Sequence, residues 1–142
     1  MAAFVVVGCG PPPAHYAAVL DEIALPSSWE LAKTEVRAPD GDVDCDPIVN
    51  AGCPAVVRYY LVDPVPLVAY AAARAAVTEA GFGLEREFDA EACDAPPSAP
   101  ACAFFAARGD DRIIVNVYRS GDDDGTGVAQ PDRSTVRVTA SR

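Results

Sequence analysis

Positive charge is scarce in this chain. It has one lysine, Lys33, and ten arginines against 21 acidic residues, which gives a formal net charge of -10 at pH 7. The basic residues form no cluster, and a surface of this charge repels phosphate backbones and anionic lipid. The composition therefore argues against nucleic-acid binding and against a polybasic membrane anchor.

The residues that common catalytic and metal sites require are also few. His15 is the only histidine, and the chain has no Gly-x-Ser-x-Gly motif that would hold a serine nucleophile. The cysteines are not spaced as Cys-x-x-Cys, which argues against a zinc or thioredoxin-like site. We therefore expect no catalytic residue, no metal ligand and no cofactor, with His15 as a solvated side chain.

The five cysteines divide into two close pairs and one isolated residue. Cys45 and Cys53 bracket one turn-rich segment, and Cys93 and Cys102 bracket another. Such a pattern predicts two disulfides, Cys45–Cys53 and Cys93–Cys102, and disulfides persist in oxidising compartments. We expect an extracytoplasmic domain in which Cys9 has a separate role.

The segment around Cys9 resembles a lipobox, the cleavage and lipidation motif of bacterial lipoproteins. Val6-Val7-Gly8-Cys9 follows an apolar run typical of a signal peptide, and three prolines after Gly10 favour an extended spacer. The resemblance implies a lipid on Cys9 and a position at the outer face of the cell membrane. No basic residue precedes the run, so we expect residues 1–13 to be a truncated signal, lipobox and spacer.

Two other interpretations of this segment stay open. Residues 3–7 could form a buried strand that leaves Cys9 as a free thiol. Alternatively, the strand and glycines could begin a methyltransferase or dinucleotide-binding fold, although Pro11, Pro12 and Pro13 stand where its third glycine and helix start belong.

The remaining residues, 14–142, predict one α+β domain: an antiparallel sheet with helices packed on one face, closed by two disulfides. Apolar spacing at Tyr16, Val19, Leu20 and Ile23 predicts a first helix that ends before Pro26. The next strand should turn Trp29, Leu31 and Val36 inward. We expect helices at 14–25 and 64–80, and strands at 29–37, 55–62, 83–88, 102–107, 112–119 and 134–140.

The second helix has the clearest boundaries. Asp63 fits the N-cap and Pro64 the first helical position. Gly81 fits the left-handed residue after the helix, which would let Phe82 pack back on Val77. Its small-sided face should lie on the sheet and consists of Ala69, Tyr70, Ala73, Ala76, Val77 and Ala80.

Three short motifs resemble small, uncharacterised lipoproteins of GC-rich Gram-positive bacteria. They are Leu-Pro-x-x-Trp at 25–29, Arg-Tyr-Tyr at 58–60 and Ala-Gly-Phe at 80–82, within a likeness that covers roughly residues 14–140. The resemblance implies a fold and a location at the cell envelope, and it implies no activity.

Acidic residues supply the remaining candidates. Asp40, Asp42 and Asp44 match positions 1, 3 and 5 of an EF-hand loop, but Cys45 and Ala51 replace the required glycine and glutamate. A loose calcium site that includes Asp46 stays open. Asp122, Asp123 and Asp124 are typical of a solvated loop, and Glu85 with Glu87 is too common a pattern to indicate a glycosidase.

The function that these patterns favour is a non-enzymatic binding or interaction module with an unknown ligand or envelope partner. Tyr59 and Tyr60 alternate along a strand, so one should face the core while the other offers a contact surface. The alternative is a small secreted hydrolase that uses carboxylates, which would require a cleft with two or more carboxyl groups of raised pKa.

Overall fold

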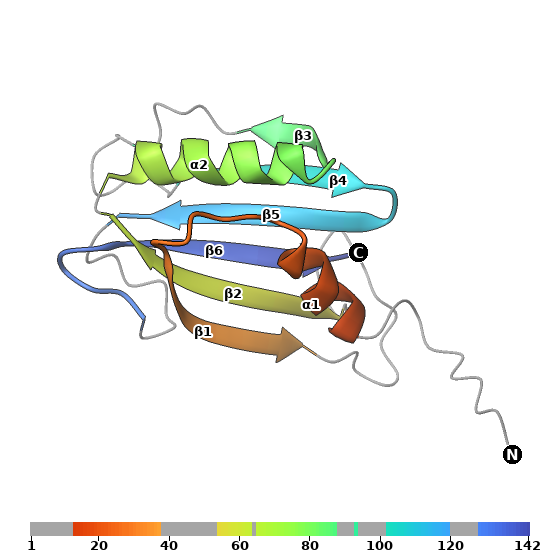
Figure 1. Cartoon of the computed structure of the whole chain (residues 1–142), viewed down its shortest axis with the longest axis horizontal. Coiled ribbons are helices and arrows are strands. Elements are labelled where there is room, and N and C mark those ends of the chain that lie inside the picture. Colours follow the sequence, from red (N-terminus) through yellow and green to blue (C-terminus); the bar gives the residue numbers. More distant parts are fainter. Residues whose placement is uncertain (1–12, 38–53, 64, 88–92, 94–101, 120–127) are drawn as a thin grey trace, which may run out of the picture.

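A computed structural model describes residues 13–37, 54–63, 65–87, 93, 102–119 and 128–142 (Figure 1). These residues contain two helices and six strands. Their bounds are α1 Pro13–Asp21, β1 Glu30–Arg37, β2 Ala55–Val62, α2 Pro66–Glu79, β3 Gly83–Glu87, β4 Cys102–Arg108, β5 Asp111–Tyr118 and β6 Ser134–Ser141.

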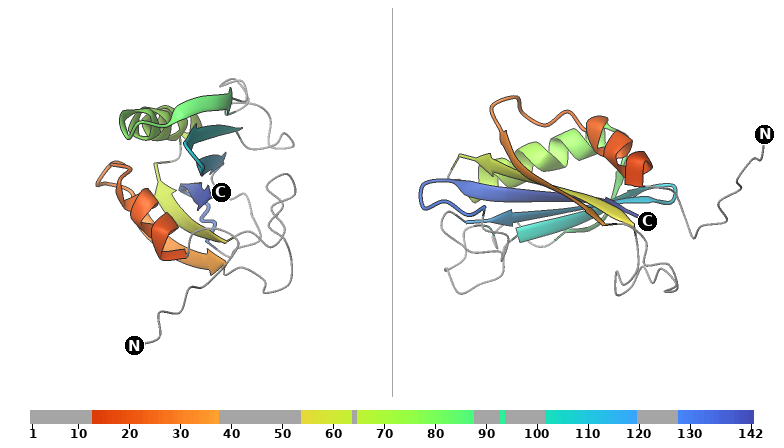
Figure 2. Two further views of the ribbon diagram at one scale, coloured as in Figure 1. Left: turned by 90° about the vertical axis from the view of Figure 1, so that its right-hand side faces the viewer. Right: turned by 90° about the horizontal axis from the view of Figure 1, so that it is seen from below.

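The six strands form one antiparallel sheet in the order β1-β2-β6-β5-β4-β3. Both helices lie on the same face of this sheet, α1 over β2 and β6 and α2 over β5 and β4 (Figure 2). This arrangement confirms the predicted α+β class. Within the described ranges, no helix is long and apolar enough to cross a membrane.

The two faces of the sheet follow from the alternation of side chains along the central strands β2, β6 and β5. On β5, Ile113, Val115 and Val117 point toward the helices and are fully buried. On β2 the residues of the opposite face are buried as well, including Val57 and Tyr59. Central strands buried on both faces become near-continuous apolar runs, as the sequence of β2 illustrates.

The C-terminus of α2 forms the capping motif that the sequence predicts. Gly81 has a φ of 93°, and its N–H donates to the carbonyl oxygen of Thr78. The N–H of Phe82 donates to the carbonyl oxygen of Val77 at 3.3 Å. These two bonds together make a Schellman motif, which satisfies carbonyl groups that the helix itself leaves unpaired.

The N-terminus of α2 differs from the prediction. The helix begins at Pro66, its N-cap is Val65, and no side chain caps it, so the expected roles of Asp63 and Pro64 are wrong. Pro66 explains the difference because a proline disfavours helical geometry at the residue before it. Val65 is extended accordingly, with φ -100° and ψ 98°.

The first helix is shorter than predicted. It ends at Asp21 instead of Leu25, although Ile23 is still buried. The N–H of Ile23 donates to the carbonyl oxygen of Leu20, an i to i−3 bond of a tightened final turn. Ile23 thus reaches the core from a turn, where apolar spacing alone predicted another helical residue.

The inward placement of β1 side chains is also wrong. Leu31 is 50% exposed and Val36 62% exposed. β1 is the edge strand next to β2, and α1 extends only over β2 and β6. Of the three residues predicted to face inward, Trp29, just before the strand, is the one that packs partly against the core.

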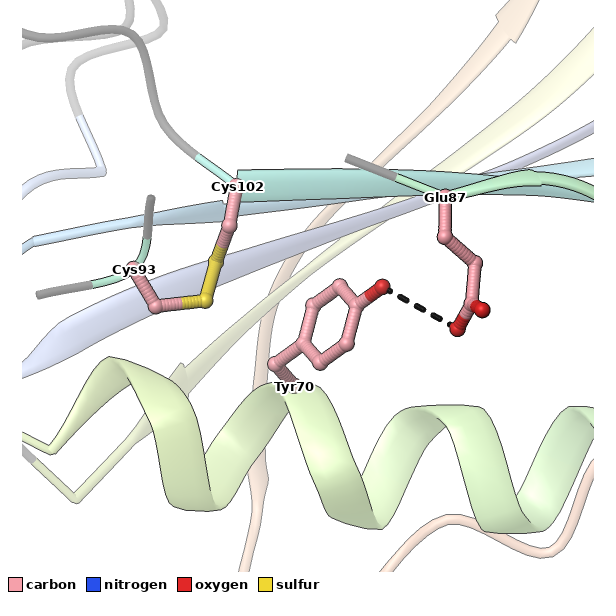
Figure 3. Close-up of a disulfide and its surroundings, with 4 residues drawn as sticks. All are labelled: Tyr70, Glu87, Cys93 and Cys102. Carbon is pink, nitrogen blue, oxygen red and sulfur yellow. Dashed lines mark hydrogen bonds between the residues drawn. A yellow bond between two sulfur atoms is a disulfide. The ribbon is translucent and has the colours of Figure 1, made fainter. Parts of the chain in front are cut away.

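The predicted disulfide between Cys93 and Cys102 is confirmed (Figure 3). It joins residue 93 to the first residue of β4, with 4.9 Å between the two Cα atoms. The second predicted bridge, Cys45–Cys53, and the proposed lipidation residue Cys9 lie outside the described residues. Both remain predictions.

Candidate functional site

A groove with a volume of about 220 Å³ lies on the helix side of the molecule, where three segments meet. These segments are the turn before β1, the residues that follow β2, and the first two turns of α2. The lining residues are Pro26, Ser28, Trp29, Val62, Asp63, Val65, Val68, Ala69 and Ala72.

Local structure places Trp29 at one wall of the groove. The N–H of Trp29 donates to the carbonyl oxygen of Pro26, which closes a turn ahead of β1. The indole ring then lies against Tyr60, with 6.1 Å between ring centroids and 55° between the planes. Because Tyr60 projects from β2 toward the helices, the sheet fixes the position of the indole ring.

The opposite wall comes from the start of α2. Pro66 begins the helix and leaves Val65 extended, so Val65 and Val68 both border the groove. Val65 is 50% exposed and Val68 is 61% exposed. Large apolar side chains gathered at the surface around a hollow are a feature of interaction sites.

The size of the groove limits what it can hold. An apolar cavity of about 150 Å³ accommodates benzene, whereas pockets for drug-sized ligands measure about 300–1,000 Å³. A volume of 220 Å³ therefore fits one aromatic or aliphatic group. Asp63 and Ser28 add hydrogen-bonding groups to this apolar lining.

The two tyrosines that the sequence singled out point to opposite faces of the sheet. Tyr60 supports Trp29 on the helix side and is half-buried. Tyr59 is 1% exposed on the other face, where its hydroxyl donates to Glu35 Oε2 at 3.4 Å. Sequence reasoning did not find the groove, although Val65 and Val68, one before and one after Pro66, were a signal for it.

His15 forms an exposed pair outside the groove. Its Nε2 lies 2.7 Å from Asp111 Oδ1, which joins α1 to the start of β5. Neither residue borders the groove at Trp29. The pair therefore supplies no acid or base to that site.

Glu87 and Glu85 do not act as a carboxylate pair. Glu87 accepts a hydrogen bond from the hydroxyl of Tyr70 (Figure 3) and another from Arg74 Nε, and both donors lie on α2. The pairing of β3 with β4 shifts register between Leu84 and Arg86, which interrupts the alternation that would align Glu85 with Glu87. Arg74 lies on the exposed side of the helix and is paired there with Glu87.

The electrostatics of Glu35 are opposite to those of a general acid. A hydrogen bond from Lys33 holds the pKa of this carboxyl below its usual range, and Tyr59 and Arg37 act in the same direction. A proton donor at neutral pH needs a raised pKa. Glu35 therefore gives no support to the hydrolase alternative.

The described residues contain no group of three histidine, cysteine or acidic side chains that could hold a metal ion. Asp40, Asp42, Asp44 and Asp46 lie outside the described ranges, as do Asp122, Asp123 and Asp124.

Comparison with family models, curated proteins and solved structures gives no match to this chain.

Proposed function

We propose that this protein is a non-enzymatic binding module of the bacterial cell envelope, and that the groove beside Trp29 receives one apolar side chain of a protein partner. The observation that carries the proposal is the groove itself. An open hollow of about 220 Å³ lies between a ring anchored on the sheet and two exposed valines. Protein interfaces concentrate binding free energy in such small pockets, which a single anchor residue fills.

Intrinsic fluorescence tests this proposal directly because Trp29 is the only tryptophan in the chain. Titration of the protein with N-acetyl-phenylalaninamide, a probe with one apolar side chain, should shift the Trp29 emission and saturate. An affinity in the millimolar range is expected, since a lone side chain lacks the surrounding interface. N-acetyl-glycinamide, which has no side chain, should leave the emission unchanged.

A pair of matched variants separates the groove from general surface hydrophobicity. Val68→Asp places a charge at the groove, whereas Val36→Asp changes a valine of nearly the same exposure on edge strand β1. Val68→Asp should abolish the saturable shift and Val36→Asp should preserve it. Equal loss in both variants, or no saturation in the unmodified protein, would refute the groove as a binding site.

The envelope location rests on the lipobox-like sequence Val6-Val7-Gly8-Cys9 and on the Cys93–Cys102 disulfide, which needs an oxidising compartment to persist. Each buried CH₂ of a lipid chain contributes about 0.8 kcal/mol, so several acyl chains hold a protein at a membrane and a bare thiol does not. With a complete signal peptide, the protein should fractionate with membranes.

The variant Cys9→Ser removes the thiol that would carry the lipid, and it should appear in the soluble fraction or in the medium. A second variant, Cys102→Ser, should leave the membrane fractionation unchanged because it affects only the folded domain. Identical fractionation of the unmodified protein and Cys9→Ser would contradict the anchor.

A further inference from the structure

The face of the sheet opposite the helices contains two buried polar atoms without a partner, both on the central strand β6. The hydroxyl oxygen of Thr135 and Nε of Arg137 are buried, and neither makes a hydrogen bond. The residues between and beyond them on β6, Val136 and Val138, belong to the helix-side core. Thr135 and Arg137 therefore project together from the other face, two residues apart.

The strand register identifies their neighbours. Arg137 is paired with Tyr59 of β2 and with Asn116 of β5, and Thr135 is paired with Tyr118 of β5. Residues directly opposite each other share a face, so these side chains surround the two unpartnered atoms. The guanidinium of Arg137 lies 5.7 Å from the centroid of the Tyr118 ring, within the range of a cation–π contact.

The side chains of this cluster become more exposed toward β5. Thr135 and Tyr59 are each 1% exposed, whereas Arg137, Asn116 and Tyr118 are half-buried. The Arg137 side chain is therefore partly accessible to solvent, while its Nε is itself buried. Among the described residues, no carboxylate lies within ion-pair distance of Arg137, in contrast to Arg58, Arg74, Arg108 and Arg133.

Leaving such groups unpaired is unfavourable. More than nine in ten buried polar groups in proteins have a hydrogen-bond partner, and an unpaired donor on a charged group costs more than one on a neutral group. A guanidinium is complementary to carboxylate and phosphate oxygens, and a neighbouring hydroxyl can donate to the same group.

We propose that Arg137 and Thr135 form a binding site for an oxyanion, the carboxylate or phosphate group of a small ligand. The site is distinct from the groove at Trp29 and lies on the other side of the sheet. The net charge of -10 opposes any anion at long range, but salt screens such repulsion within about 8–10 Å at physiological ionic strength. Local hydrogen bonds therefore determine binding.

The test follows the Nε–Hε nuclear magnetic resonance signal of Arg137 in the folded chain, assigned by its absence in Arg137→Lys. Inorganic phosphate and acetate are titrated in separate experiments, with ionic strength held constant by chloride. A saturable shift with either anion is the expected result. The anion that binds more tightly identifies the ligand group as a phosphate or a carboxylate.

Two variants make the test specific. Thr135→Val preserves side-chain shape and should weaken anion affinity roughly tenfold, since it removes a hydrogen bond to a charged group. Without anion it should raise the melting temperature, because it also removes an unpaired buried hydroxyl. Arg112→Met removes the same charge from an exposed position on the same face of β5 and should leave anion affinity unchanged.

Three outcomes would overturn the proposal: no saturable shift with either anion, an equal loss of affinity in Arg112→Met, or full affinity in Thr135→Val. The first would mean that water satisfies both atoms. Thr135→Val also covers the case in which a substitution of Arg137 prevents folding.

Discussion

The guanidinium of Arg108 lies 4.5 Å from the centroid of the Phe82 ring. The same side chain donates a hydrogen bond to the carbonyl oxygen of Ala80 at 2.8 Å and another to Glu22 Oε2. One residue of β4 thus holds the end of α2 and the turn after α1. This contact requires the chain to reverse at Gly81, which directs Phe82 back over the helix end.

The reversal at Gly81 gives the first prediction. A Cβ at this position would meet Arg108 Cδ at 3.7 Å, an ordinary contact, so the cost of Gly81→Ala comes from the φ of 93°. We expect a loss of about 1–2 kcal/mol in the free energy of unfolding, measured by urea denaturation. Gly83→Ala is the control, because Gly83 lies in strand β3 without a positive φ and its Cβ would meet the carbonyl oxygen of Ala107 at 3.8 Å, an ordinary contact; it should be neutral or slightly stabilising. Equal losses would contradict the backbone explanation.

The contact between α2 and the sheet gives the second prediction. Ala73 is fully buried against the sheet, and Ala73→Leu should destabilise the protein by about 1–3 kcal/mol because the extra volume has no space. Ala75 is exposed on the same helix, and Ala75→Leu should change stability by less than about 0.5 kcal/mol. Thermal denaturation followed by circular dichroism distinguishes the two. Similar melting temperatures for both variants would show that α2 does not pack closely.

The disulfides give the third prediction. Cys93 and Cys102 are nine residues apart, and replacement of both by serine should reduce the free energy of unfolding by roughly 2–3 kcal/mol in the chain-entropy model. Cys45→Ser with Cys53→Ser should cost a similar amount if the second predicted bridge forms. Mass spectrometry of non-reduced peptides checks the pairing independently. A crossed pairing such as Cys45 with Cys93 would disprove the predicted framework.

The Lys33–Glu35 pair gives the fourth prediction. Because the folded state lowers the pKa of Glu35, its contribution to stability is present above the usual value of 4.5 and is lost as pH falls through the lower folded-state value. The difference in unfolding free energy between the unmodified protein and Glu35→Gln should therefore be larger at pH 7 than at pH 3. The pair is partly exposed, so the effect should stay below about 1 kcal/mol.

Lys33→Met provides the comparison for this pair because it removes the largest cause of the lowered pKa. It should reduce the difference between Glu and Gln at position 35 in a double-mutant cycle at pH 7. A difference that does not vary with pH would show that the charge of Glu35 has no role in stability.

Residues with strong local preferences were predictable from the sequence. The left-handed Gly81 and the β-branched residues of β2, β5 and β6 gave the correct elements with ends displaced by one or two residues at most. These preferences depend on single residues and their near neighbours, so they can be recognised in the sequence directly. The start of α2 was mispredicted because two prolines competed for the first helical position, and the requirement of Pro66 for an extended Val65 prevailed.

The sites were less predictable than the elements. Alternation showed that Tyr59 and Tyr60 point in opposite directions, but it could not show that Trp29 packs against Tyr60 or that two valines lie across the groove from it. Those contacts join residues from separate segments. The cluster around Arg137 depends in the same way on the register of three strands.

The α+β composition of this protein, the C-terminal capping of α2 and the Cys93–Cys102 bridge follow from the sequence alone, because each depends on residues close together in the chain. Tertiary structure decided which apolar residues are buried. Leu31 and Val36 have the hydrophobicity of core residues, yet both are exposed because β1 is the edge strand and α1 covers β2 and β6. Burial depends on what packs above a strand, and that follows from the order of strands in the sheet, which local preferences do not encode.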